Sequence, residues 1–269
     1  MHIRKTHPIR DRVKLIVFLF VLMIILGVLA QLVFSHKNHE KTATIERLLK
    51  TAMEPVGITM YIWGGGWDGA DQASGATSTQ IGLCAQWLKF AGMQDENYNF
   101  KEHRYERENG LDCSGYVGWV LYNTFEKESG QAGYVTVSTN MAKQLAERGW
   151  GKLIKNPKQF LAGDIISMEG HVWICLGTCE DGSVLLVHSS PPGVSVCGTN
   201  GIAVLLATEY MTEKHSKWQE MYPNREVSLS YLENVTVFRW NKSVMSDAEE
   251  IQSLNGEEIV RILTSDMVQ

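Results

Sequence analysis

The longest continuous hydrophobic pattern in the chain is an uncharged apolar run at residues 15–34, LIVFLFVLMIILGVLAQLVF. Residues 1–14 before it contain five basic residues and a single acid, Asp11. Twenty residues of helix span roughly 30 Å, which is the thickness of the hydrocarbon core of a bilayer. The pattern predicts a transmembrane anchor at 15–34, with residues 1–14 as a basic cytoplasmic tail and the remainder outside the cytoplasm.

A cleaved secretory signal is the alternative, because Val28-Leu29-Ala30 offers a small-residue cleavage site. We favour the uncleaved anchor, since the apolar run is longer than a usual signal core and continues past Ala30. The protein is then a single-pass membrane protein, and otherwise a secreted one. Both interpretations place the remainder of the chain outside the cytoplasm.

The segments after the apolar run alternate between polar and amphipathic patterns. Residues 35–54 predict a polar stalk that ends in a short helix, IERLLKTAME. Residues 55–66, PVGITMYIWGGG, form a β-like run with three final glycines, which permit positive φ or the close approach of another backbone. Residues 67–110 are polar and glycine-rich, and predict an insertion or lid whose charged run at 101–108 is solvated. Residues 241–269 form a polar, acidic C-terminal tail.

The second half of the chain changes from helical to strand-like patterns. A helix is predicted at 138–149, where Ser138 or Thr139 begins it and Gly149 ends it. Strands are then predicted at 164–168, 171–177, 183–190, 201–206 and 235–240, with Gly- and Pro-containing turns between them. Closely spaced strands with short turns favour an antiparallel sheet. Helices first and strands afterwards indicate an α+β fold.

The stretch LDCSGYVGWVLYNTF at 111–125 predicts a turn that leads directly into a buried helix, with Cys113 in the first helical turn. Asp112 is suited to be the N-cap, because its carboxylate can accept the free backbone N–H groups of the helix start. A cysteine at this position lies at the positive end of the helix dipole, which favours the thiolate. Cys113 is therefore a candidate nucleophile, although a lone cysteine is more often a small buried residue.

Two histidines downstream lie where they could serve this cysteine. His171 begins one predicted strand and His188 lies in the next. Adjacent antiparallel strands can place two histidines side by side on one face. If that face packs on the helix that carries Cys113, His171 can take the thiol proton and His188 can orient His171. The same three residues could instead ligate zinc, but closely spaced ligand pairs such as C-x-x-C are absent, so we predict no metal.

Charge and composition exclude several classes of partner and cofactor. The net charge is −5, and it becomes about −9 without the basic tail, which argues against nucleic acid as a partner. The three glycines at 64–66 lack the GxxxxGK[ST] or GxGxxG context of a phosphate-binding loop, and no cofactor is predicted. Besides Cys113, four cysteines remain for disulfides, and no pairing is assigned to Cys84, Cys175, Cys179 and Cys197.

Four segments in this order resemble the NlpC/p-sixty-type cysteine peptidases, which cut bacterial cell-wall peptides. The segments are YIWGGG at 61–66, LDCSGYVGWV at 111–120, LAGDIISMEGHVWICLG at 161–177 and LLVHSS at 185–190. The resemblance covers roughly residues 55–206. It implies a pared-down papain-like fold, in which the catalytic cysteine begins a central helix packed on an antiparallel sheet, with residues 55–240 as the catalytic domain.

The resemblance also implies roles for six residues. Cys113 matches the nucleophile, His171 the general base and His188 the third polar residue. Tyr61 matches a tyrosine that lines the cleft and helps to hold the oxyanion, and Asp112 and Ser114 match positions that receive the end of the stem peptide. The implied reaction is hydrolysis of peptidoglycan stem peptides at the γ-D-glutamyl–diamino acid bond. The 44 residues of the insertion depart from the usual spacing of the motifs.

Two alternative functions remain open at this point. One is a non-catalytic scaffold that binds the wall or protein partners in an envelope complex. The other is an amidase or acyltransferase with the same Cys-His chemistry. The reactivity of the Cys113 thiol is expected to separate the scaffold from the enzymes, because a depressed pKa speeds alkylation near neutral pH.

Overall fold

The structure is a computed structural model that describes residues 22–23, 43–69, 72–155 and 157–265. The chain divides into two units, Met1–Thr42 and Ala43–Gln269. Of the predicted anchor at 15–34, only Leu22 and Met23 belong to the described residues, and they are helical and exposed. Within the described ranges, no helix combines the length and the apolar character that crossing a bilayer requires.

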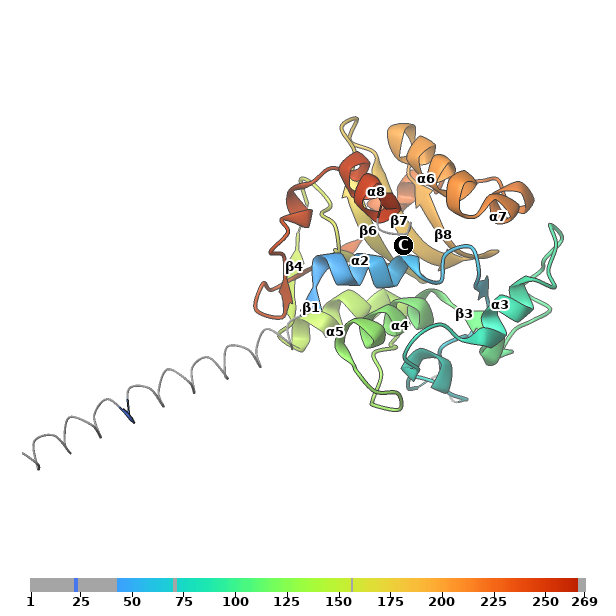
Figure 1. Ribbon diagram of the computed structural model, residues 1–269, viewed down its shortest axis with the longest axis horizontal. Coiled ribbons are helices and arrows are strands. Elements are labelled where there is room, and N and C mark those ends of the chain that lie inside the picture. The colour runs from blue at the N-terminus through green and yellow to red at the C-terminus, as the bar shows by residue number, and fades with distance from the viewer. Residues whose placement is uncertain (1–21, 24–42, 70–71, 156, 266–269) are drawn as a thin grey trace, which may run out of the picture. The chain divides into compact units, whose positions relative to one another are not determined.

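The second unit is built on an eight-stranded, mostly antiparallel sheet (Figure 1). Its strands lie in the order β3-β2-β8-β7-β6-β5-β9-β4, and β2 and β3 pair in parallel. In chain order the strands are β2 (Met60–Tyr61), β3 (Gly110–Leu111), β4 (Gly151–Ile154), β5 (Ile165–Met168), β6 (His171–Thr178), β7 (Val184–Ser190), β8 (Gly193–Gly198) and β9 (Thr236–Trp240). A separate parallel pair joins β1 (Ala43–Thr44) to β10 (Met245–Ser246).

Helices surround this sheet and complete a mixed α+β fold (Figure 1). The α-helices are α2 (Ile45–Met53), α3 (Ala85–Ala91), α4 (Cys113–Phe125), α5 (Met141–Glu147), α6 (Gly201–Lys214), α7 (Ser216–Met221) and α8 (Gly256–Ser265). The 3-10 helices are η1 (Ala76–Thr79), η2 (Arg107–Asn109), η3 (Ser138–Asn140), η4 (Leu229–Leu232) and η5 (Ile251–Ser253). The predicted α+β class is thus confirmed.

Helix α4 is the central element of the core. Nearly every residue of the helix is buried, as its apolar pattern on all sides predicted. Val117, Val120 and Leu121 belong to the same hydrophobic cluster as Val172 of β6 and Val187 of β7. Tyr116 donates a 2.7 Å hydrogen bond to the carbonyl of Ala52 at the end of α2. The helix start is therefore fixed between the sheet and α2.

The other face of the central strands carries a second hydrophobic cluster, which includes Trp173, Cys175, Leu186 and Cys197. Its side chains alternate along β6 and β7 with those that pack on α4, as the pleat of a strand requires. The segment around η4 covers part of this face through Tyr231. The two faces of the sheet are thus covered by different parts of the chain.

The predicted strand at 201–206 is wrong, because these residues form the first half of α6. Ile202 and Val204 suit a strand, but Ala203, Ala207 and Tyr210 recur at helical spacing and are buried. The residues that do pair beside β7 are those of β8, directly after the Pro-Pro-Gly turn. A short apolar run alone does not distinguish a strand from a buried helix.

The expected domain borders also differ from the compact unit that the structure gives. Residues 45–53 were expected to belong to the stalk, but Leu48, Leu49 and Ala52 are buried against the core. The expected tail at 241–269 contributes β10, η5 and α8, and Ile259 and Leu263 of α8 are buried. Helices with this amphipathic pattern gain their stability by burying one face on the domain.

Candidate active site

Cys113 is the first residue of α4, and Asp112 is its N-cap, as the sequence predicted. Asp112 Oδ1 accepts a 2.7 Å hydrogen bond from the backbone N–H of Gly115 and a 2.8 Å bond from the Ser114 hydroxyl. These bonds satisfy a donor that the helix itself leaves free. They also fix the turn in which the thiol of Cys113 is presented.

The glycines at 64–66 lie against this turn. Gly64 and Gly66 have φ of 82° and 89°, which glycine adopts at little cost. A Cβ on Gly66 would lie 2.5 Å from the Cα of Gly115, so the two backbones approach more closely than any other residue would permit. The N–H of Asp112 donates to the carbonyl of Gly65 at 3.0 Å. The glycines therefore provide both features that the sequence suggested, positive φ and the close approach of another backbone.

Ser114 links the insertion to the helix start. Its hydroxyl donates to Asp112 and accepts a 3.0 Å bond from the indole N–H of Trp67. Both Ser114 and Trp67 are buried. The Ser114 hydroxyl therefore helps to hold the Asp112 carboxylate in its N-cap position. Trp67, Ser114 and Asp112 form one hydrogen-bonded network at the nucleophile turn.

Tyr61 lies next to the same turn, because β2 pairs with β3 and Tyr61 is opposite Leu111. Burial is the main cause that raises the pKa of its phenol, and the nearby Asp112 carboxylate adds to the shift. Tyr61 therefore keeps its hydroxyl proton at neutral pH and can donate a hydrogen bond. The structure thus brings all three residues that the resemblance associated with substrate and oxyanion to one place, Tyr61, Asp112 and Ser114.

The two histidines form a hydrogen-bonded pair. His171 Nε2 and His188 Nδ1 are 3.0 Å apart, and the two rings are nearly perpendicular, at 81°. His188 is buried, with 3% of its surface exposed. One ring must donate and the other accept, so the bond couples the tautomers of both histidines.

The position of this pair relative to α4 differs from the expected arrangement. His171 and His188 follow the alternation of Trp173 and Leu186, which is the face opposite to the one on α4. The Cys113 thiol approaches the start of β6 from the face that packs on α4. It lies 4.0 Å from the carbonyl oxygen of Gly170. Among the described residues no direct hydrogen bond joins Cys113 to His171, although the thiol lies against the backbone on both sides of it.

The ionisation state of Cys113 is opposite to that expected from the helix dipole. Burial, and then the negative charge of Asp112, raise the pKa of the thiol to about 12, and backbone hydrogen bonds offset this only in part. Burial also lowers the pKa of His171 to about 4. The predicted thiolate is therefore wrong for the resting protein, because desolvation of a buried thiolate outweighs the dipole of one helix end. At neutral pH the site holds a thiol and two neutral imidazoles.

This ionisation state predicts slow alkylation of Cys113. We expect iodoacetamide to modify it slowly at pH 7, with a rate that rises about tenfold per pH unit as the thiolate fraction grows. Mass mapping of modified peptides would separate Cys113 from Cys84, which is half-buried and serves as the internal comparison. Rapid labelling of Cys113 at pH 7 would instead mean that its pKa is depressed.

A second prediction follows from the lowered pKa of His171. The unfolded chain binds this proton near pH 6.5 and the folded protein only near pH 4, so the free energy of unfolding falls as the pH is lowered through that window. His171→Gln cannot take the proton. The stability of the wild type relative to this variant is expected to drop by about 3 kcal/mol between pH 7 and pH 4 in urea titrations. Parallel pH profiles for the two proteins would contradict the assignment.

Tyr231 is a residue near the site that the sequence patterns did not identify. Its ring centroid lies 5.4 Å from that of His171 and 5.8 Å from that of His188. Burial raises its pKa to about 12, so it stays a neutral phenol. It comes from η4, which is far along the chain from His188, and no spacing rule connects the two.

The described residues contain no group of three or more His, Cys, Asp or Glu side chains placed to hold a metal ion. All five cysteines are described, and all are free of disulfides. Cys175 lies in the apolar cluster on the same face of the sheet as the histidines.

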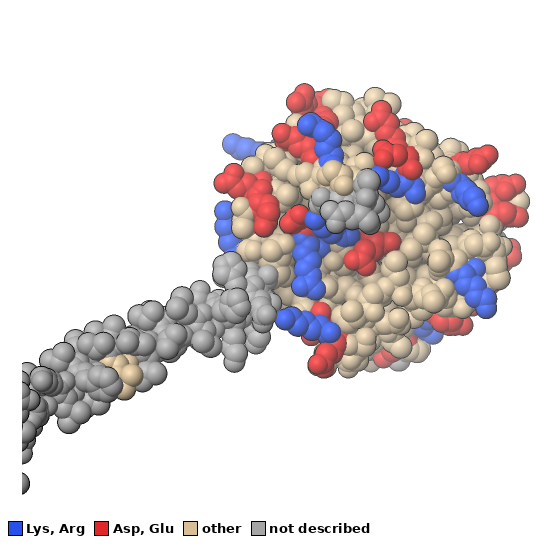
Figure 2. All heavy atoms as spheres, in the orientation of Figure 1, with Lys and Arg blue, Asp and Glu red and all other residues tan. Residues whose placement is uncertain are grey.

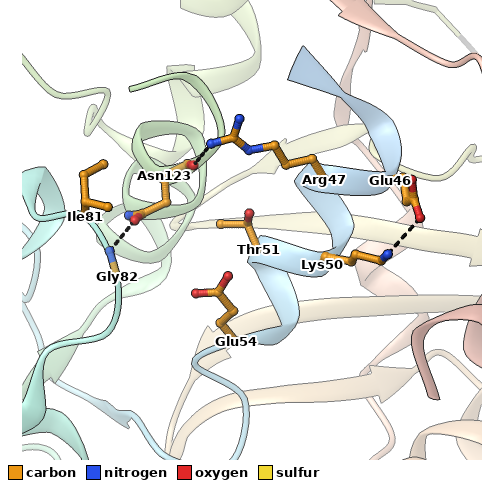
Figure 3. Close-up of a pocket in the computed structure, with 8 residues that line it drawn as sticks. All are labelled: Glu46, Arg47, Lys50, Thr51, Glu54, Ile81, Gly82 and Asn123. Carbon is orange, nitrogen blue, oxygen red and sulfur yellow. Dashed lines mark hydrogen bonds and ion pairs between the residues drawn. The ribbon is translucent and has the colours of Figure 1, made fainter. Parts of the chain in front are cut away.

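A cavity of about 360 Å³ lies elsewhere, between α2, the C-terminal half of α4 and the loop at Ile81–Gly82 (Figure 3). Its wall includes Asn123, whose carbonyl accepts a 2.9 Å bond from Arg47. Asn123 is ten residues after Cys113, which corresponds to about 15 Å along a helix. The cavity is thus distinct from the nucleophile turn.

No protein-family model matches the chain, and searches of curated proteins and of solved structures also found no match.

Proposed function

We propose that the chain is a membrane-anchored, extracytoplasmic cysteine peptidase with a papain-like fold that hydrolyses peptidoglycan stem peptides. The observations that carry this proposal are the 3.0 Å hydrogen bond between His171 and His188 and the Cys113 thiol, which begins a buried helix and lies 4.0 Å from the carbonyl oxygen of Gly170, the residue before His171. A base with its far nitrogen held by a second polar group, next to a nucleophile, is the arrangement that Cys-His catalysis needs.

The tautomers of the pair follow from this role. His188 Nδ1 faces Nε2 of His171, so Nδ1 of His171 is the nitrogen left for the thiol proton. His171 must then carry its own proton on Nε2, and this N–H donates the hydrogen bond to Nδ1 of His188. The neutral resting state of the site fits a base that takes the proton as the sulfur attacks, since a buried ion pair is absent beforehand.

The reaction then proceeds in two balanced steps. The Cys113 sulfur bonds to the scissile carbonyl carbon while its proton passes to His171, and the leaving amine takes that proton as the C–N bond breaks. Water gives its proton to His171 and its oxygen to the acyl carbon, which releases the acid and restores the thiol. The backbone N–H of Cys113 and the hydroxyl of Tyr61 are the donors for the oxyanion.

The bond that we propose is the one between the γ-carboxyl of D-glutamate and the following diamino acid. Full-length protein would be incubated with stem-peptide muropeptides of known sequence, and the products identified by mass. We expect a new carboxyl and a new amine at that bond with the wild type, and neither with a folded Cys113→Ala variant. Cleavage by Cys113→Ala would contradict the proposal, and release of ammonia or transfer to an acceptor amine would favour an amidase or acyltransferase.

A non-catalytic scaffold that binds the wall or partners in an envelope complex is the second candidate. The observation that favours it is the burial of Cys113, which is 6% exposed and has a raised pKa. The paired histidines argue against a scaffold, which has no need of them. A wild-type protein that binds stem peptides and leaves all of them intact would nevertheless support the scaffold.

A further inference from the structure

Two arginines and two aromatic residues contact one another near the candidate site. We call this cluster the arginine–aromatic stack (Trp63, Arg104, Tyr105 and Arg107). The Arg104 guanidinium lies 5.2 Å from the ring centre of Trp63 and 5.6 Å from that of Tyr105. The Arg107 guanidinium lies 5.0 Å from the ring centre of Tyr105 as well. The charged run at 101–108 was expected to be merely solvated, but its arginines are held in place by aromatic rings.

The stack is open to solvent, although it contains large apolar groups. Trp63 is 45% exposed and Tyr105 is 46% exposed. Arg104 is exposed too, and among the described residues no carboxylate forms an ion pair with it. Exposed aromatic rings around an arginine that has no acidic partner leave both apolar faces and N–H donors for another molecule.

The backbone at Tyr105 supports a functional reason for this arrangement. Tyr105 has φ of 65°, in the left-handed region that an aromatic residue rarely adopts. Its N–H donates a 2.9 Å bond to the carbonyl of Trp63, which ties the loop to the end of β2. Such conformations are unfavourable and persist where the surroundings enforce them, often at ligand sites.

The chain order places the stack at the edge of the nucleophile turn. Trp63 follows Tyr61 by two residues, and Tyr61 is opposite Leu111, two residues before Cys113. Charged groups of both regions act on the Tyr61 phenol, because Arg104 lowers its pKa while Cys113 and Asp112 raise it. Tyr61 therefore lies close to both the stack and the nucleophile turn.

We propose that the arginine–aromatic stack is a substrate-binding site for a peptide carboxylate, which the Arg104 guanidinium binds while Trp63 and Tyr105 contact the adjacent aliphatic part. This inference rests on the proposed function, and the carboxylate is the α-carboxylate of D-glutamate next to the scissile bond. The chain carries a net charge of −5, so an anionic substrate needs a local cation to bind near Cys113. Figure 2 shows acidic and basic side chains intermixed on one face of the molecule, without a large patch of either charge.

The test compares two peptides that differ only at this carboxylate. One is L-Ala-γ-D-Glu-L-Lys with a free D-glutamyl α-carboxylate and an amidated C-terminus, and the other carries the α-carboxamide. Calorimetric Kd values would be measured with full-length Cys113→Ala, so that turnover does not interfere. We expect the carboxylate form to bind about tenfold more tightly, as a charge-assisted pair at a partly exposed site would give.

Arg104→Gln in the same background is expected to remove this preference without weakening the carboxamide. Arg148→Gln is the matched control, because Arg148 is also exposed and stacks on Tyr134 and Trp150, at 5.6 and 5.3 Å. An unchanged preference in Arg104→Gln, equal affinity for the two peptides, or no binding of either would overturn the inference. Cleavage by the wild-type chain is read out separately, so the proposed function can stand if the inference fails.

Discussion

Replacing His171 by alanine is expected to lower kcat on stem peptides about a thousand-fold, within the range of 10²–10⁴ that a general base supplies. Its Nε2 is bonded to His188, and its other nitrogen is the acceptor that we assign to the thiol proton. A thiol whose pKa is about 12 cannot ionise unaided at neutral pH, so the loss of this acceptor removes the means of attack. The measurement is steady-state turnover with product identification by mass.

The control for this prediction is His215→Ala, which removes another half-buried histidine, at the junction of α6 and α7. Its pKa is also lowered by burial, so the two variants are matched in charge state. We expect His215→Ala to retain activity, and His188→Ala to lose less than His171→Ala. Full activity in a folded His171→Ala protein would refute the assigned base.

The second large effect is expected on stability, at the buried ion pair between Asp164 and Arg239. The guanidinium binds the carboxylate through two parallel hydrogen bonds, Nε to Oδ1 at 2.8 Å and Nη2 to Oδ2 at 2.6 Å. The Asp164 side chain is completely buried, and Oδ2 also accepts the N–H of Leu161 at 2.9 Å. Asp164→Ala leaves the arginine without its partner and is expected to lower the free energy of unfolding by about 3–5 kcal/mol.

Urea unfolding of Asp164→Ala against the wild type measures this loss. Glu147→Gln is the comparison, because it breaks an exposed pair with Lys143 at 3.8 Å and is expected to change stability by less than about 1 kcal/mol. A similar small effect for both variants would show that the Asp164–Arg239 pair contributes little to the free energy of unfolding. Asp164 of the motif at 161–177 thus links the start of β5 to Arg239 of β9.

The sequence was most informative where local chemistry and pattern agree. Asp112 before an apolar run predicted the start of α4. The apolar runs around His171 and His188, with a short turn between them, predicted β6 and β7 and the proximity of the two rings. These features depend on a few neighbouring residues and on the short turn between two strands. They could be derived without knowledge of the rest of the fold.

The features that sequence reasoning missed depend on groups that are distant in the chain. Tyr231 reaches the histidines from η4, and no periodicity marks it. The pKa of Cys113 is set by the depth of burial, which a helix-start pattern does not contain. The face that packs on α4 is decided by the whole sheet, and it is the face without the histidines.

The parallel pairing of β1 with β10 determines how mechanical load would enter the domain. Two rungs, Ala43 opposite Met245 and Thr44 opposite Ser246, join the first described residues of the unit to its C-terminal segment. Tension on the chain before Ala43 therefore acts first on these rungs and on α2. Helix α2 is linked to α4, the helix of Cys113, because the Ala52 carbonyl accepts a hydrogen bond from Tyr116. Pulling from this end would stretch the attachment of the nucleophile helix before it loads β6 and β7, so the proposed activity is expected to be force-sensitive in a chain held by the proposed anchor.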